Sequence, residues 1–143
     1  MKKILVLLIA AIVCSATGMA QKVKEIQPKK LPDISLRTLA TYFDGKNVTQ
    51  AMTVDDKMDR HYEVSLDDGT IIHFDKQGVW KLVKACGESL PQRMVPGMIN
   101  MYLQKNKIEA SVVGMQRDKD KNFIIDLSDG TTLTFTETFK LVE

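Results

Sequence analysis

The sequence predicts an α+β fold, in which a unit of one helix packed on a four-stranded antiparallel sheet occurs twice in tandem. Two observations lead to this prediction. The segment Tyr62–Thr70 returns as Phe123–Thr131, with apolar residues at the same alternate positions and Asp-Gly near the end of each copy. Alternation is typical of strands with one buried face, and Asp-Gly is a strong hairpin signal. An internal repeat indicates two copies of one supersecondary structure that bury their apolar faces together.

The first twenty residues predict a signal peptide rather than a part of the fold. A basic start at Lys2 precedes an apolar run (residues 4–13) that is too short to span a membrane, and small residues suit cleavage after Ala20. The alternative is lipid attachment at Cys14, which the bulky Val13 before it disfavours. We therefore expect a periplasmic or secreted protein with no transmembrane segment after cleavage.

The charge and cysteine content of residues 21–143 exclude several classes of protein. This part of the chain has 18 basic and 18 acidic side chains without a basic stripe, which argues against nucleic-acid binding. Cys86 is its single cysteine, so no intramolecular disulfide can form, and stability must come from core packing.

The chain divides into four segments in this interpretation. Residues 1–20 are the signal peptide, and the polar, lysine-rich residues 21–30 are expected to form a flexible N-terminal arm. Repeat unit 1 covers residues 31–86 and repeat unit 2 covers residues 87–143, so that together they make one domain.

Each unit starts with an expected helix. In the first, Leu36, Leu39 and Phe43 share one helix face, and Ser35 is the expected N-cap. In the second, Pro96 suits the first helical turn. Strands are expected around residues 48–54, 62–66, 72–74 and 80–82 in unit 1, and around residues 108–113, 123–127, 132–135 and 139–142 in unit 2.

The alternation also predicts which side chains point away from the helices. If Trp80 and Leu82 point toward the helix, then Lys81 and Val83 point away from it. The resulting outward face mixes polar and β-branched residues, which suits a protein or peptide better than a small molecule. An ordinary solvated sheet face is the alternative. The candidate binding face comprises Glu63, Ile71, His73, Lys81, Ile124, Asp126, Thr132 and Thr134.

No catalytic or metal-binding constellation is evident. The two histidines, His61 and His73, lack the further ligands at recognisable spacing that a zinc site needs, and His73 is interpreted as a solvated sheet residue. Cys86 is interpreted as a small buried hydrophobic residue rather than a nucleophile. Asp68 and Asp129 are interpreted as turn residues rather than calcium ligands. We expect no enzymatic activity, no cofactor and no metal.

The chain resembles the PepSY-like family, also called β-lactamase-inhibitor-like. The resemblance rests on Leu31-Pro32 before a short helix, the run Tyr62–Asp75, Gly78 and Trp80 beyond it, and a second, weaker copy. It covers residues 31–143 and implies a layout similar to the β-lactamase inhibitory protein, in which paired sheets grip a protein partner. It also implies a periplasmic location, without an established activity or ligand.

Two functions follow as expectations. The first is a non-catalytic binding protein of the cell envelope that holds a protein or peptide on its open sheet face. Inhibition of the bound partner is one version of this function. The alternative is a protein that responds to a small ligand or an ion bound between the two units. A broad open sheet would favour the first function, and a closed apolar cavity between the units would favour the second.

Overall fold

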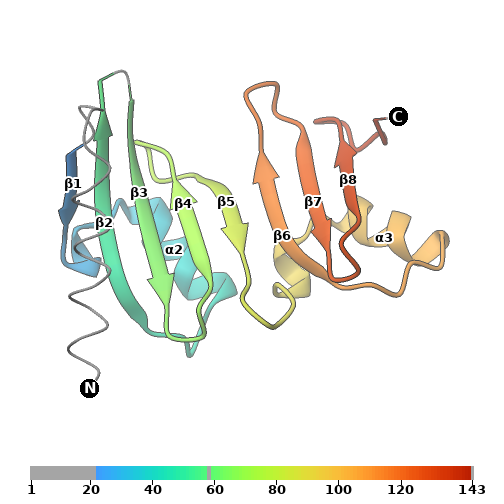
Figure 1. Ribbon diagram of the computed structural model, residues 1–143, viewed down its shortest axis with the longest axis horizontal. Helices are drawn as coiled ribbons and strands as arrows, with labels where there is room; N and C mark the ends of the chain where they lie inside the picture. The colour runs from blue at the N-terminus through green and yellow to red at the C-terminus, as the bar shows by residue number, and fades with distance from the viewer. Residues whose placement is uncertain (1–21, 58, 143) are drawn as a thin grey trace.

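The computed structural model describes residues 22–57 and 59–142. The predicted signal peptide, its cleavage site and Cys14 lie outside these residues. Within these residues twelve elements follow one another (Figure 1), two of them short 3₁₀ helices, η1 and η2. They are β1 (Lys22–Glu25), η1 (Pro28–Lys30), α2 (Asp33–Tyr42), β2 (Val48–Asp56), β3 (Asp59–Leu66), β4 (Ile71–Phe74), β5 (Trp80–Lys84), η2 (Gln92–Met94), α3 (Gly97–Lys105), β6 (Val112–Arg117), β7 (Phe123–Leu127) and β8 (Thr132–Phe135).

The eight strands in the described part of the chain form one antiparallel sheet, and each strand pairs with the next. Figure 1 shows both helices behind the same face of this sheet, α2 behind the N-terminal strands and α3 behind the C-terminal strands. The predicted α+β class is therefore confirmed. The sheet does not divide into two sets of four strands, because five strands precede α3 and three follow it. The assignment of residues 31–86 and 87–143 to two repeat units stays a prediction.

Two predicted segments differ from the structure at the ends of the sheet. The expectation of a flexible arm is wrong for Lys22–Glu25, which pair with β2 as an edge strand. An edge strand needs only backbone partners, so its polar side chains give no warning of the pairing. The strand expected at residues 139–142 is reduced to a single bridge between Phe135 and Leu141. Phe139 has a φ of 64°, which interrupts an extended chain.

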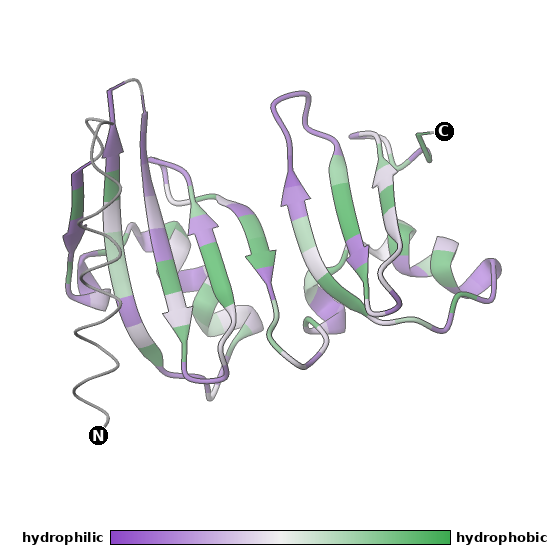
Figure 2. Ribbon diagram, in the orientation of Figure 1, coloured by the Kyte–Doolittle hydropathy of each residue, from purple (hydrophilic) through white to green (hydrophobic). Residues whose placement is uncertain are grey.

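The hydrophobic core lies between the sheet and the two helices. Its fully buried members come from both halves of the chain and include Ile72, Phe74, Ile99, Ile125 and Phe135. Burial of each such side chain contributes about 1.5–3 kcal/mol to folding. Figure 2 shows hydrophobic and hydrophilic residues alternating along the strands, with hydrophilic residues at the tips of the long hairpins. One face of the sheet is thus committed to the core.

The start of α2 differs from the prediction. The helix begins at Asp33 after Pro32, so Ser35 lies inside the first turn and is not the N-cap. The Ser35 side chain is fully buried, and its hydroxyl donates a hydrogen bond of 2.9 Å to the carbonyl oxygen of Gly78. This bond ties α2 to the β4–β5 turn. The helix α3 follows Pro96, as its fixed φ favours.

The β3–β4 and β7–β8 turns use the same local hydrogen bond. Oδ1 of Asp68 accepts the N–H of Thr70, and Oδ1 of Asp129 accepts the N–H of Thr131, both at 2.9 Å. The bond from Thr131 lowers the pKa of Asp129. Burial opposes ionisation of Asp68, but hydrogen bonds from Thr70 and the charge of Lys46 outweigh it, so its pKa is also lowered. The two predicted turn aspartates therefore stabilise hairpins.

Candidate functional site

The face of the sheet opposite the helices is the candidate functional surface, named here the open face. Strand pairing places one residue from each of seven neighbouring strands in a row across this face. Three members of the row, Met52, Leu82 and Ile124, are apolar and lie beside polar neighbours. The complete row is Met52, Glu63, His73, Leu82, Gln116, Ile124 and Thr134.

A second row runs parallel to the first, two residues away from it on each strand. Within it, the Thr132 hydroxyl donates a hydrogen bond of 2.9 Å to Oδ1 of Asp126, and Ile71 is 41% exposed. The row contains Ile71, Lys84, Gly114, Asp126 and Thr132. Seven of the eight residues of the candidate binding face thus lie in two adjacent rows on one face. Their role in binding stays a prediction.

The eighth residue, Lys81, lies in a β-bulge that the alternation did not foresee. Phe74 pairs with Trp80 but His73 pairs with Leu82, so Lys81 is an extra residue in β5. A bulge of one residue reverses the faces that follow it. Leu82 therefore lies on the open face and Val83, only 1% exposed, faces the core, which is the opposite of the prediction. Nζ of Lys81 lies 3.8 Å from Oδ2 of Asp75.

Both histidines of the chain lie on the open face beside one carboxylate. His61 and Glu63 are two residues apart on β3 and share a face, and His73 pairs directly with Glu63 from β4. Nε2 of His61 lies 3.0 Å from Oε1 of Glu63, and Nε2 of His73 lies 3.8 Å from the same oxygen. The two imidazole centroids are 5.6 Å apart. All three side chains are half-buried, and their ligand-type atoms lie within 4.8 Å of one another.

This set contradicts the expectation that the histidines lack a further ligand. Sequence spacing missed it because Glu63 and His73 are brought together by strand pairing and not by proximity in the chain. The available signal was the alternation itself, which puts His61, Glu63 and His73 on one face. Burial lowers the pKa of His73, and its interaction with the neighbouring His61 acts in the same direction, while the carboxylate of Glu63 opposes both. The neutral imidazole, which can accept a cation, is thus favoured at His73.

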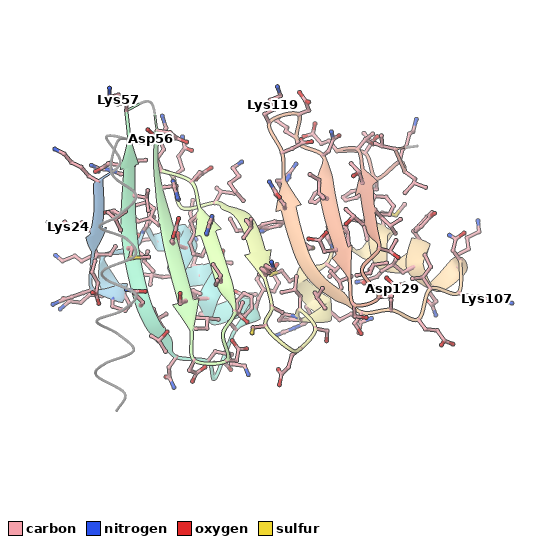
Figure 3. The ribbon with its side chains drawn as sticks, in the orientation of Figure 1. Lys24, Asp56, Lys57, Lys107, Lys119 and Asp129 are labelled. Atoms are coloured by element: carbon pink, nitrogen blue, oxygen red, sulfur yellow. The ribbon has the colours of Figure 1, made fainter. Side chains whose placement is uncertain are left out.

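An open groove of about 500 Å³ borders this cluster where β5 and β6 diverge. Only three residue pairs join these two strands. Figure 3 shows that the tip of the β2–β3 hairpin, with Asp56 and Lys57, and the β6–β7 tip, with Lys119, stand at the same end of the sheet. Both signs of charge line the groove. Its walls include His61, His73, Leu82, Gln116, the carboxylates of Asp59, Asp75 and Asp118, and the basic side chains of Lys81, Arg117, Lys119 and Lys121.

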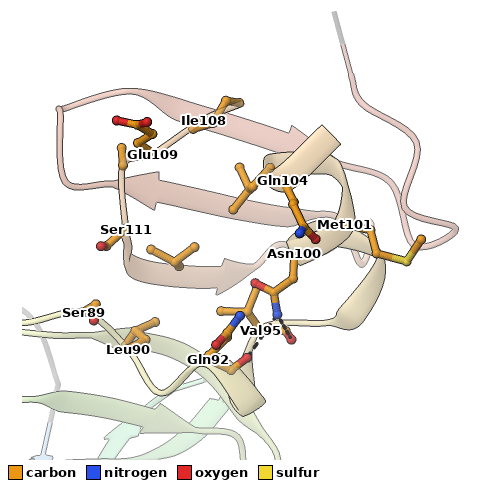
Figure 4. A pocket seen from close by; sticks show the side chains of 13 residues that line it. Ser89, Leu90, Gln92, Val95, Asn100, Met101, Gln104, Ile108, Glu109 and Ser111 are labelled. Carbon is orange, nitrogen blue, oxygen red and sulfur yellow. Dashed lines mark hydrogen bonds between the residues drawn. The ribbon is translucent and has the colours of Figure 1, made fainter. Parts of the chain in front are cut away.

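A second cavity, also of about 500 Å³, lies on the helix side between α3 and the segment that leads into β6 (Figure 4). Nδ2 of Asn100 projects from α3 and donates hydrogen bonds to the carbonyl oxygens of Gln92 (3.1 Å) and Val95 (3.2 Å). Asn100 therefore joins η2 to α3, and Glu109 is the only ionisable residue in the lining. We assign this cavity no function.

Cys86, expected to be buried, is instead an exposed free thiol in the segment between β5 and η2.

The comparison with family models identifies the group to which the chain is related. The model of a family described as "Putative beta-lactamase-inhibitor-like, PepSY-like" matches residues 60–143. The chain belongs to the PepSY-like family. The predicted resemblance is confirmed, although the match begins in β3 rather than at residue 31. The matched part contains the histidine cluster and every candidate face residue. No protein of curated function matches the chain.

Solved structures of periplasmic proteins share the fold. A "putative calcium-regulated periplasmic protein" from Bacteroides thetaiotaomicron is 30% identical, with a TM-score of 0.80, over 85% of this chain and 94% of that one. A "putative periplasmic protein from DUF2874 family" from Bacteroides vulgatus is 29% identical, with a TM-score of 0.80, over 87% of this chain and 97% of that one. A third, from Bacteroides vulgatus and described as of unknown function, is 23% identical, with a TM-score of 0.75, over 87% and 100%, and shows the fold alone. Neither helix among the described residues of our chain has the length and apolarity to cross a bilayer.

Proposed function

We propose that this protein is a periplasmic, non-catalytic binding protein that holds a peptide or protein partner on its open face. The observation that carries this proposal is the face itself, on which residues from seven paired strands lie in register while both helices pack on the other side. The predicted signal peptide and the periplasmic description of the relatives support the location.

The chemistry of the open face supports a macromolecular partner. Ile71 and Ile124 lie in the two rows that cross its centre, and charged side chains surround the groove between β5 and β6. Apolar side chains set among polar and charged ones suit a protein interface, which as a whole is about as apolar as the rest of a protein surface. Small-molecule sites are enclosed and mostly apolar, whereas this groove is open and lined mainly by polar residues. The descriptions of the relatives name no enzymatic activity, which supports a non-catalytic role. Inhibition of a partner enzyme is one form that such binding would take.

The second candidate function, response to an ion, is favoured by two observations. One relative is described as calcium-regulated, and the present chain gathers His61, Glu63 and His73 beside the groove between β5 and β6. Calcium takes six to eight oxygen ligands. Because the cluster offers one carboxylate and two imidazoles, it suits a different ion, and calcium regulation would need another site.

Matched isoleucine variants on opposite faces test the proposed binding surface. We expect Ile71→Glu and Ile124→Lys to abolish capture of a partner from envelope extract, because interface energy concentrates in a few central residues. Ile34→Glu is the control, since Ile34 on α2 is 48% exposed, comparable to Ile71 at 41%. Circular dichroism melts check that all three variants fold. Equal capture by the three folded variants and the parent protein would exclude the open face as the binding surface.

A further inference from the structure

We propose that His61, Glu63 and His73 form a three-ligand site for a divalent transition-metal ion of the zinc class on the open face. This site does not depend on the proposed partner. The chain has two histidines in all, and strand pairing places both beside the same carboxylate oxygen. His61 and Glu63 belong to β3, and His73 to β4, which lies between β3 and β5. Ligands on paired strands are held more precisely than ligands on loops.

The distances between the ligand atoms fit one small cation. Zinc lies about 2.0–2.1 Å from nitrogen and oxygen ligands, so the ligand atoms of a tetrahedral site are about 3.3–3.4 Å apart. The separations of 3.0 Å and 3.8 Å from Oε1 of Glu63 to the two imidazole nitrogens bracket this value. All three ligand atoms lie within 4.8 Å of one another, so small rotations of the imidazole rings complete the site.

The ligand set selects the class of metal. Two imidazoles and one carboxylate are a common zinc set, whereas calcium and magnesium are bound mainly through oxygen. The three side chains are between 29% and 32% exposed, so an ion can reach them from solvent. A fourth tetrahedral position is left for water. No protein ligand beyond these three is required.

A simple histidine–carboxylate hydrogen bond explains only part of this geometry. The 3.0 Å contact between His61 and Glu63 is a hydrogen bond, but His73 reaches the same oxygen at 3.8 Å, beyond hydrogen-bond length. Both imidazoles therefore converge on one oxygen without each gaining a bond from it. Strand pairing brings the three groups together, and a cation coordinated by all of them at once would give His73 the bond that the shared oxygen does not.

Isothermal titration calorimetry with Zn²⁺ tests the site. The untagged protein carrying Cys86→Ser, which removes the exposed thiol as a rival ligand, is freed of metal with a chelator and titrated at neutral pH. We expect one equivalent of Zn²⁺ to bind with a micromolar or lower Kd. His73→Gln and Glu63→Gln should each weaken binding at least tenfold, since loss of even an outer contact costs 10–100-fold. Asp126→Asn, which changes another carboxylate on the open face, should leave the Kd unchanged.

Spectroscopy and competition supply the results that would overturn the site. With Co²⁺ bound, the protein should show the intense visible bands of four-coordinate cobalt. The double variant His61→Gln/His73→Gln should lack these bands, while a cooperative thermal melt shows that the variant is folded. Unchanged Zn²⁺ affinity in that folded double variant would overturn the assignment, as would the lack of saturable binding below millimolar Zn²⁺. Displacement of Zn²⁺ by equimolar Ca²⁺ would refute the class of metal. Since none of these measurements involves a partner, they are independent of the capture assay.

Discussion

Replacement of Gly78 by alanine should be among the most destabilising single-methyl additions in this protein. Gly78 has a φ of 94°, and a Cβ added there would lie 2.6 Å from Cβ of Pro32 and 2.9 Å from Oγ of Ser35. The positive φ costs about 1–2 kcal/mol for alanine, and overpacking of the helix–turn contact adds about 1–3 kcal/mol. We therefore expect Gly78→Ala to lower the free energy of unfolding by about 2–5 kcal/mol.

Gly130 provides the matched control for this prediction. Its φ is 88°, almost the same as that of Gly78, but an added Cβ would meet no atom within 4 Å. Gly130→Ala should therefore cost only the conformational part, about 1–2 kcal/mol. Urea unfolding, followed by circular dichroism, gives both values. If Gly78→Ala costs no more than Gly130→Ala, then the close contact of the β4–β5 turn with the start of α2 is not a constraint, and the reasoning is refuted.

Three further outcomes test the register, the turns and the N-terminus. Val83→Ala should lower the free energy of unfolding by about 1–3 kcal/mol, because Val83 is buried in the core, whereas Leu82→Ala on the open face should lower it by less than about 1 kcal/mol. A lower urea midpoint for Leu82→Ala than for Val83→Ala would argue against the β5 bulge. Because the pKa of Asp129 is lowered by folding, its charge stabilises the protein above the unfolded pKa, about 3.9, and this stabilisation is lost as the pH falls through the folded value. The stability gap between the parent and Asp129→Asn should thus be largest near neutral pH and close in acid, whereas a gap independent of pH would contradict this role. Mass spectrometry of the exported protein should show a chain that starts at residue 21, and a lipid on Cys14 would contradict cleavage after Ala20.

Much of the local structure could be predicted because it depends on neighbours in the chain. The Asp-Gly turns at Gly69 and Gly130 both have positive φ, as the hairpin signal requires. The alternation in β3 and β7 also identified their buried faces, with Val64 and Ile125 fully inside the core. These features need only short-range geometry, so they appear in the order of the residues.

The histidine cluster was harder to foresee because it depends on contacts between strands. The sequence places His61, Glu63 and His73 on one face but does not say which residues lie opposite each other. The β3–β4 register decides that Glu63 meets His73, and it follows from the Asp68–Gly69 turn together with the packing of both strands on the core. A shift of one residue would have separated the three side chains.

By itself, the sequence determined the α+β class, the paired hairpin turns, the side of most strands that is buried, and the likeness to the PepSY-like family. Only the tertiary structure decided that β1 joins the sheet edge, that a bulge at Lys81 turns Val83 inward, and that both histidines meet one carboxylate. The physical reason is the range of the interactions involved. Turns and alternation arise from backbone sterics over a few residues, whereas edge pairing, bulges and cross-strand neighbours depend on which distant segments satisfy one another's hydrogen bonds.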